Sequence, residues 1–300
     1  MSRISKLLQG SVLLLVLVGS AQAHVGDQVF PIYELADGDL EAIDLRDGQV
    51  SEWEQLIGGP TLSPGAFVAY PDVGQVPAYD PDDLDYRIWL AWHRSTQRIY
   101  VATQRIDDVH IAYAGEEPEE RMWRYDIIEF MVDGDHSGGT YHAFHITEDD
   151  NPPDGDLLNG RTAQHFWASA SAPGGRPVWY FGAGNDWVTR LPYADGGGGS
   201  QGVNPTTTAI EFFVTPFDDL VYDRPDSSRV STLYVGKIIG FQISVPDFDE
   251  EPGAYRGFYT LYGQTATWRD ADRFVDGQLL GPQATAVEGA SWARIKASFR

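Results

Sequence analysis

Apolar and polar residues alternate over short stretches along much of the chain. The clearest stretch runs from Tyr86 to Trp92, where every second residue is large and apolar. A period of two places alternate side chains on opposite faces of a β-strand. A similar stretch from Arg98 to Ile106 follows the polar run Ser95-Thr96-Gln97. The two stretches predict a β-hairpin that ends at Asp107 and Asp108.

The stretch from Trp123 to Gly139 combines a predicted strand with an acidic, glycine-rich loop. Ile128, Phe130 and Val132 share one parity and are expected to face a core. Glu129 then falls on the opposite, more accessible face, where folding does not require a carboxylate. We therefore take Glu129 as the first candidate for a functional residue.

Further short stretches predict more strands, and no long amphipathic helix appears; only Ser51 to Leu56 suggests a short one. The segment from His24 to Leu56 is otherwise loop-like, and Pro60 to Asp83 is expected to be a surface excursion. Gly196 to Gly199 predicts a flexible loop. Many short strands between turn signals predict an all-β fold, an antiparallel β-sandwich of the jelly-roll or immunoglobulin-like type with long loops and few short helices. The remaining predicted strands are Tyr141 to Ile146, Ala163 to Ala170, Val178 to Phe181, Ala209 to Val214, Lys237 to Val245, Phe258 to Gly263 and Ala293 to Phe299.

The first 23 residues have the pattern of a secretory signal peptide. Arg3 and Lys6 precede an apolar run from Val12 to Val18, which is too short to span a bilayer. Ala21-Gln22-Ala23 provides a small-residue cleavage site, so we expect a secreted or periplasmic protein. Cleavage after Ala23 leaves 277 of the 300 residues, which we expect to form a single domain from residue 24 to 300.

The chain is strongly acidic and contains no cysteine. Removal of the signal takes the formal charge from −23 to −25, because it removes two basic residues and no acidic one. This charge disfavours nucleic acid and anionic membrane surfaces as partners. It is compatible with neutral ligands and with divalent cations. Since no disulfide can form, the fold must depend on its apolar core.

A series of short motifs also occurs in a characteristic order. The series contains Asp47-Gly48 followed by Trp53, Ile99-Tyr100-Val101, Asp107-Asp108, the set Trp123, Asp126, Glu129 and Asp133, then Ala209-Ile210-Glu211, the run from Ile239 to Val245 with Asp247, and Trp268-Arg269-Asp270 with Phe274. In this order the motifs resemble the family 9 carbohydrate-binding modules, and the resemblance extends from about residue 47 to 299. It implies a β-sandwich that binds carbohydrate without catalysis, in support of polysaccharide degradation, and that contains structural calcium.

The resemblance also implies which residues hold the sugar. Trp123 and Trp268 would sandwich a sugar ring, and Glu129 would accept hydrogen bonds from its hydroxyls. Six residues of straight strand would separate Trp123 from Glu129 by ~20 Å. Both can therefore contact one sugar only if Trp123 lies on a loop that folds back over the strand. An arginine that the family places after a strand of the Ala163-Gln164 type is not evident here.

Two acidic segments are candidates for the calcium ligands. Asp133 and Asp135 lie two positions apart in a glycine-rich loop, as hard oxygen ligands often do. A solvated turn explains that loop equally well, since the twelve-residue EF-hand pattern is not complete. Asp107 and Asp108 form a second candidate, although paired acids also end edge strands. Asp247 and Asp249 are similar.

Purely structural roles and other functions stay open at this stage. Trp123 and Trp268 could be core residues, and we expect Trp89, Trp92, Trp167 and Trp179 to lie in the core or at its rim. A haem-binding electron-transfer sandwich could use Met131 and His142 as axial ligands. Cleavage after Ala23 would also make His24 the mature N-terminus, as in copper enzymes that oxidise polysaccharides; the second ligand would be His93, His110, His142, His145 or His165. For glycoside hydrolysis, no motif singles out a pair of carboxylates.

Overall fold

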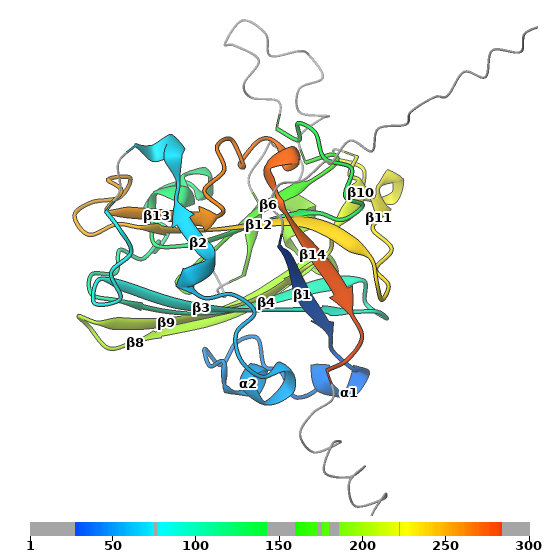
Figure 1. Ribbon diagram of the computed structural model, residues 1–300, viewed down its shortest axis with the longest axis horizontal. Coiled ribbons are helices and arrows are strands. Elements are labelled where there is room, and N and C mark those ends of the chain that lie inside the picture. Colours follow the sequence, from blue (N-terminus) through cyan, green and yellow to red (C-terminus); the bar gives the residue numbers. More distant parts are fainter. Residues whose placement is uncertain are drawn as a thin grey trace, which may run out of the picture.

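A computed structural model describes residues 28–74, 77–142, 160–172, 176–179, 186–221 and 223–283. The expected signal peptide, His24 and the strand predicted at 293–299 lie outside these residues. In the described residues, two layers of β-strands pack face to face, and two short α-helices lie against one of them (Figure 1). The all-β sandwich expected from the sequence is therefore confirmed. None of the helices in these ranges combines the length and the apolar run that crossing a bilayer would require.

The lower layer in Figure 1 is an antiparallel set of four strands. In spatial order it contains β3 (Leu84–His93), β4 (Arg98–Asp107), β9 (Thr206–Val214) and β8 (Ala194–Gln201). The pair of β3 and β4 is the hairpin that the alternation predicts, and its ten-residue register ends with Leu84 opposite Asp107.

The upper layer is also antiparallel, and β1 connects the two layers. The upper strands are β2 (Phe67–Ala69), β13 (Gly257–Leu261), β12 (Ile238–Asp247), β5 (Ile128–Asp133), β6 (Gln164–Ala168) and β7 (Val178–Trp179). β14 (Val275–Leu280) pairs with β12, while β1 (Val29–Glu34) pairs in parallel with both β14 and β3. A separate ribbon joins β10 (Phe217–Asp219) to β11 (Arg229–Val230).

Helical segments are short. The α-helices are α1 (Asp37–Leu40) and α2 (Ser51–Ile57). The 3₁₀ helices are η1 (Pro64–Ala66), η2 (Pro71–Val73), η3 (Glu119–Arg124), η5 (Asp186–Thr189), η6 (Pro225–Ser227) and η7 (Ala271–Arg273).

The main core lies between the two layers. Ile88 and Leu90 of β3 face it, as their parity predicts, and Phe130 of β5 faces it from the upper layer. The rings of Phe130 and Phe212 meet edge to face, with centroids 6.2 Å apart. Each fully buried side chain of this size stabilises the fold by about 1.5–3 kcal/mol. The contact between these rings shows that the opposed faces of the two layers share one core.

A second core covers the outer face of the lower layer. The odd-numbered residues Trp89 and Ala91 of β3 point outward and pack against Trp53 and Ile57 of α2. Trp53 is fully buried, and its indole Nε1 donates a hydrogen bond of 2.6 Å to Glu211 on β9. α2 ends at Gly58, whose φ of 78° is in the left-handed region. Both faces of β3 are therefore buried.

The expectation of a flexible loop at Gly196 to Gly199 is wrong, because these glycines lie inside strand β8. The chain around Leu45 and Arg46 lies directly on this strand. A Cβ atom added to Gly197 would come within 2.3 Å of the Leu45 carbonyl oxygen and 2.7 Å of the Arg46 Cα. Glycine is needed here for close backbone approach, while the hydrogen bonds to β9 require no side chain.

Other expectations also need correction. The segment before Leu56 contains β1, and the expected surface excursion contains β2. β14 was not expected either, because Gly277 interrupts its apolar pattern; a Cβ there would come within 2.7 Å of the Ile32 side chain in β1. These strands are short or irregular in pattern, and pairing with distant segments defines them. Of the strand predicted from Tyr141 to Ile146, residues 143–146 lie outside the described residues.

The close contact at β8 leads to a stability prediction. We expect Gly197→Ala to lower the free energy of unfolding by about 1–3 kcal/mol, because the added methyl group meets backbone atoms that cannot move independently. Gly199→Ala is the matched control, since its Cβ would meet the nearest atom at an ordinary 3.6 Å. Urea unfolding of both variants measures the difference. Equal effects of the two substitutions would contradict the packing described here.

Candidate functional site

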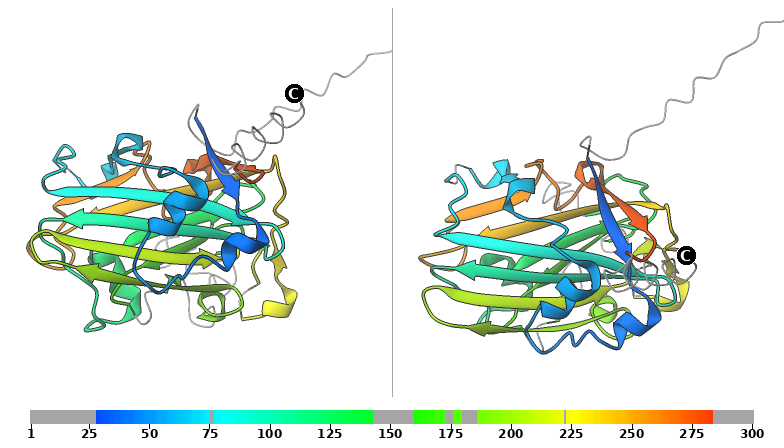
Figure 2. Two further views of the ribbon diagram at one scale, coloured as in Figure 1. Left: turned by 90° about the horizontal axis from the view of Figure 1, so that it is seen from below. Right: turned by 60° about the horizontal axis from the view of Figure 1, so that its bottom comes forward.

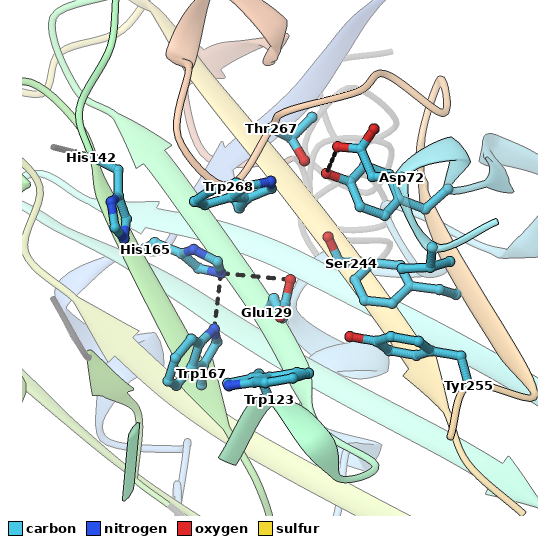
Figure 3. A pocket seen from close by; sticks show the side chains of 13 residues that line it. Asp72, Trp123, Glu129, His142, His165, Trp167, Ser244, Tyr255, Thr267 and Trp268 are labelled. Carbon is cyan, nitrogen blue, oxygen red and sulfur yellow. Dashed lines mark hydrogen bonds and ion pairs between the residues drawn. The ribbon is translucent and has the colours of Figure 1, made fainter. Parts of the chain in front are cut away.

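A cavity of about 580 Å³ opens on the outer face of the upper layer. Its floor is formed by β6, β5 and β12, and its walls are formed by loop residues around Tyr70, Trp123, His142, Tyr255 and Trp268 (Figure 3). Its volume falls in the range of about 300–1,000 Å³ that is common for small-molecule sites. The residues that matter most below are Trp123, Trp268, Glu129, His165, Trp167 and Tyr255.

Strand register brings the floor residues together. Glu129 on β5 is directly opposite Trp167 on β6 and Ser244 on β12. Directly opposed residues of antiparallel strands point to the same face, so these three side chains form a row across the floor. The inward residues Ile128 and Phe130 face the main core, as predicted.

The expectation that Glu129 lies on an accessible strand face needs correction. Glu129 is only 6% exposed, because loops cover this face of β5. One of these loops contains η3, which places Trp123 over the strand. Trp123 therefore lies on a segment that folds back over β5, which is the condition for Trp123 and Glu129 to contact the same sugar. Trp268 lies in the loop after β13 and is half-buried, while Trp123 is 37% exposed. Figure 3 shows the two indoles on opposite sides of the cavity, with Glu129 between them.

A histidine and an indole that are hydrogen-bonded to each other lie beside Glu129. Trp167 donates its Nε1–H to His165 Nε2 over 3.1 Å. An indole nitrogen can only donate, so His165 Nε2 is the acceptor and its neutral ring carries the proton on Nδ1. The Glu129 Oε2 atom, 3.6 Å from the same Nε2, therefore receives no proton from it. Among the described residues, none donates a hydrogen bond to either oxygen of Glu129.

Two tyrosines add hydroxyl groups to the cavity. Burial raises the pKa of Tyr255, and burial together with a hydrogen bond to Asp72 raises the pKa of Tyr70. Both phenols therefore remain protonated at neutral pH. The Tyr255 hydroxyl points into the cavity beside Ser244 (Figure 3). The cavity thus combines flat apolar faces with a few polar groups.

Hydrogen bonds from distant segments position the loop that carries Trp268. The Asp72 Oδ2 atom accepts hydrogen bonds from the Tyr70 hydroxyl and from the Ala266 backbone N–H, each 2.7 Å long. On the other side, the buried Tyr141 hydroxyl donates to the Thr267 carbonyl at 2.7 Å. The edge of His142 packs against the Trp268 indole, with ring centroids 5.4 Å apart. The position of this indole is therefore set by contacts far away in sequence.

Sequence reasoning missed part of this site. Trp167 belongs to a buried apolar cluster, as expected, but it also lines the cavity next to Glu129, which was not expected. His165, Asp72 and Tyr255 carried no motif. The register between β5 and β6 would have found Trp167 and His165, because it places Trp167 opposite Glu129.

The first pair of expected calcium ligands mainly closes a turn. Asp133 accepts hydrogen bonds from the backbone N–H groups of Ser137 and Gly138, at 3.3 and 2.7 Å. Asp135 accepts from Ser137 as well, and burial raises its pKa. Among the described residues, no third acidic or histidine ligand joins these two. Calcium at Asp133 and Asp135 stays a prediction.

The second pair, Asp107 and Asp108, belongs to a larger acidic group. Their oxygens and those of Asp249 lie within 4.8 Å of one another, and Asp249 forms a second such set with Asp83 and Asp247. We name Asp83, Asp107, Asp108, Asp247 and Asp249 the aspartate group. Burial raises the pKa of Asp247 to about 7, although the Arg105 charge acts in the opposite direction.

Two arginines compensate only part of the charge of the aspartate group. Arg105 is buried and forms ion pairs with Asp107 at 2.6 Å and Asp247 at 2.9 Å, and it also pairs with Asp126. Arg256 lies 3.3 Å from Asp83 and 3.1 Å from Asp249. The buried oxygens Asp247 Oδ2 and Asp249 Oδ1 have no hydrogen-bond partner among the described residues. Several acidic oxygens thus remain available to a hard cation.

The haem alternative is not supported by the arrangement of its proposed ligands. Met131 is fully buried and does not line the cavity, whereas His142 does. The two side chains therefore do not both face that cavity. His24, which the copper alternative requires, lies outside the described residues.

Comparison with solved structures supports the fold. The chain is similar to a family 9 carbohydrate-binding module from Caldicellulosiruptor kristjanssonii in complex with cellotriose, at 13% identity and a TM-score of 0.50, covering 85% of this chain and 96% of that one. A structure of a family 9 module from the same organism with glucose has 12% identity and a TM-score of 0.49, over 84% and 97%. No protein-family model matches the sequence, and no curated relative does. The resemblance in fold that the motifs indicate is confirmed.

The anchoring of the Trp268 loop can be tested directly. We expect Asp72→Ala to accelerate amide hydrogen exchange in residues 262–270 and to lower stability by about 1–3 kcal/mol, since it removes two hydrogen bonds to a carboxylate. Asp82→Ala, which removes an exposed carboxylate ten residues further along the chain but leaves the bonds to Tyr70 and Ala266 intact, should leave this exchange unchanged. Unaltered protection in the Asp72 variant would show that the loop does not depend on this residue.

Proposed function

We propose that this protein binds carbohydrate without catalysis, with one sugar ring held between Trp123 and Trp268. The observation that carries the proposal is Glu129, a carboxylate on the floor of the cavity that is 6% exposed. Among the described residues it receives no hydrogen bond. A buried carboxylate without donors is unfavourable by itself, and a ligand rich in hydroxyl groups would supply them.

The walls of the cavity suit the apolar faces of a sugar ring. A pyranose has an apolar C–H face and a rim of hydroxyls, so flat indoles suit its faces and polar groups suit its rim. The Trp123 indole is partly exposed, so in the free protein its apolar surface contacts water and does not stabilise the fold. Tyr255 and Ser244 can donate to sugar oxygens beside Glu129.

Hydrolysis is the less favoured function for this cavity. Glycosidases of the retaining and inverting types require two carboxyl groups that flank the scissile bond. Asp72 and Glu129 are the only acidic residues among the described ones that line the cavity. Asp72 already accepts hydrogen bonds from Tyr70 and Ala266 through one oxygen, so its role is to anchor the loop.

The sequence and the compared structures support a setting for this function. The similar family 9 module is described in complex with cellotriose, which supports a β-glucan as the first ligand to test. We also propose that cleavage after Ala23 releases the protein to the periplasm or the exterior, where it would support polysaccharide degradation. The strong acidity favours a neutral glycan over nucleic acid or an anionic membrane.

Sugar binding is tested by titration of cello- and xylo-oligosaccharides while tryptophan fluorescence is followed. We expect Trp123→Ala and Trp268→Ala each to weaken binding by about tenfold or more, which corresponds to ~1.4 kcal/mol. Glu129→Gln should weaken it as well, because the strongest acceptor is lost. Tyr234→Ala, at an exposed aromatic residue that does not line the cavity, is the control. Unchanged affinity in both tryptophan variants would refute the proposed site.

We further propose that the aspartate group holds a structural calcium ion. The residues fit such an ion, because at least two buried aspartate oxygens there have no hydrogen-bond donor among the described residues and calcium takes six to eight oxygen ligands. The ion would join the end of the β3–β4 hairpin, through Asp107 and Asp108, to the segment after β12. Its effect would be to hold the sandwich together at this edge.

Removal of calcium should lower the melting temperature, because a ligand that binds only the folded state stabilises it by about 2.7 kcal/mol at one hundred times its Kd. We expect EDTA to destabilise the wild-type protein and calcium to reverse the effect. Combined Asp108→Asn and Asp249→Asn substitutions should reduce this response, whereas Asp135→Asn should not. A full calcium response in the double variant would place the ion elsewhere.

A further inference from the structure

A second acidic group lies on the opposite outer face of the sandwich, under the N-terminal segment. Its centre is Glu211, which points outward from β9 in the lower layer. Its neighbours across the strands are Ala102 on β4 and Gly197 on β8. Because both neighbours are small, the space above the Glu211 carboxyl group remains open to another segment of the chain.

The chain from Leu45 to α2 occupies that space. Figure 2 shows this blue segment lying across the outer face of the lower layer. Gly48, with a φ of 69°, turns the chain so closely against β8 that its missing side chain would come within 3.0 Å of Gly199. Asp47 precedes this turn, and Glu52 lies in the first turn of α2. Oxygen atoms of Asp47, Glu52 and Glu211 all lie within 4.8 Å of one another.

The Glu211 carboxyl group points independently to a missing ligand. Its side chain is 0% exposed, and Oε1 accepts the 2.6 Å hydrogen bond from the Trp53 indole. Its other oxygen, Oε2, is buried and has no hydrogen-bond partner among the described residues. The same is true of Glu52 Oε1. Buried carboxylate oxygens at such close range need either a shared proton or a cation between them.

No described basic side chain supplies that charge. Arg46 is the nearest basic residue in sequence, but its guanidinium binds both oxygens of Asp195 at 2.6 Å. The neighbouring charges that act on Glu211 come from Glu52 and Asp47, and both are acidic; burial together with these charges raises the pKa of Glu211 to about 9, so in the absence of a cation its carboxyl group shares a proton with Glu52. The group therefore lacks its counter-ion, and only a proton or a metal ion is small enough to take that place.

We propose that Asp47, Glu52 and Glu211 bind a divalent cation of the calcium type. Calcium–oxygen distances are about 2.3–2.6 Å, so oxygens on opposite sides of one ion are up to ~5 Å apart. The observed limit of 4.8 Å allows all three carboxyl groups to contact the same ion. Asp47 is exposed, which gives the ion access from solvent and leaves room for water ligands.

This site is separate from the sugar cavity and from the aspartate group. The cavity opens on the outer face of the upper layer, whereas Glu211 faces outward from the lower layer. A cation there would connect the Asp47 turn, α2 and β9, which are far apart in sequence. It would therefore fix the N-terminal segment to the sheet without any contribution to sugar contacts.

The test uses the full chain after removal of the signal. Asp108→Asn and Asp249→Asn are introduced to weaken cation binding by the aspartate group. After treatment with EDTA and removal of the chelator, CaCl₂ is titrated by calorimetry and melting temperature is measured in parallel. We expect this background protein still to bind calcium and to melt at a higher temperature with it. Glu211→Gln should weaken this binding at least tenfold and abolish the thermal shift.

Glu211→Gln separates loss of the ion from loss of the fold. The glutamine oxygen can still accept from Trp53, and its amide can donate to Glu52, so in EDTA the variant should be at least as stable as the background. Glu54→Gln, which removes an exposed acid on the same helix, is the charge-matched control and should keep the calcium response. Asp47→Asn, at an exposed position, repeats the test if the Glu211 variant does not fold.

The proposal fails if millimolar calcium produces no shift in the background protein, which would mean that a shared proton alone holds the carboxyl groups. It also fails if Glu211→Gln or Asp47→Asn responds to calcium as strongly as Glu54→Gln.

Discussion

The antiparallel pairing of β5 between β6 and β12 is the constraint from which both the core and the cavity follow. In this register, Ile128 and Phe130 point toward the lower layer, and Glu129 necessarily points away from it. The same register places Trp167 and Ser244 on either side of Glu129. A shift of one residue would bury the carboxylate in the main core and expose the phenylalanine. The apolar contacts of one face therefore hold the polar floor of the other face in place.

The two outer faces of the sandwich are covered in different ways. The N-terminal segment and α2 seal the lower face, where Trp53 and Trp89 pack together and glycines in β8 allow close backbone contact. The upper face is covered by loops that leave a cavity between them. This difference explains why the nine tryptophans of the chain serve unlike purposes. Some fill a sealed layer, and others stand at the edge of an opening.

Excess negative charge is the second theme of the structure. The chain brings acidic groups together in places where the described residues supply too few basic ones, most clearly around Arg105 and beneath Trp53. Removal of one partner from a buried ion pair typically costs about 3–5 kcal/mol, because it leaves the other charge without compensation. Counter-charges for these groups, whether from arginine or from bound cations, are therefore part of what stabilises the fold.

The local pattern of the sequence determined the fold class, the β3–β4 hairpin and the inward face of β5, because side-chain parity within one strand depends only on neighbouring residues. The resemblance of the motifs to the family 9 modules singled out Trp123, Glu129 and Trp268, which the structure places around one cavity. The local pattern has limits. It could not reveal β1, β14 or the glycine strand β8, since pairing with distant segments defines them. Nor could it reveal Asp72, His165 and Trp167 as parts of the site, or Glu211 as the centre of an acidic group. Their positions depend on register and loop contacts between segments up to 194 residues apart, as between Asp72 and Ala266, and only the folded chain brings such segments together.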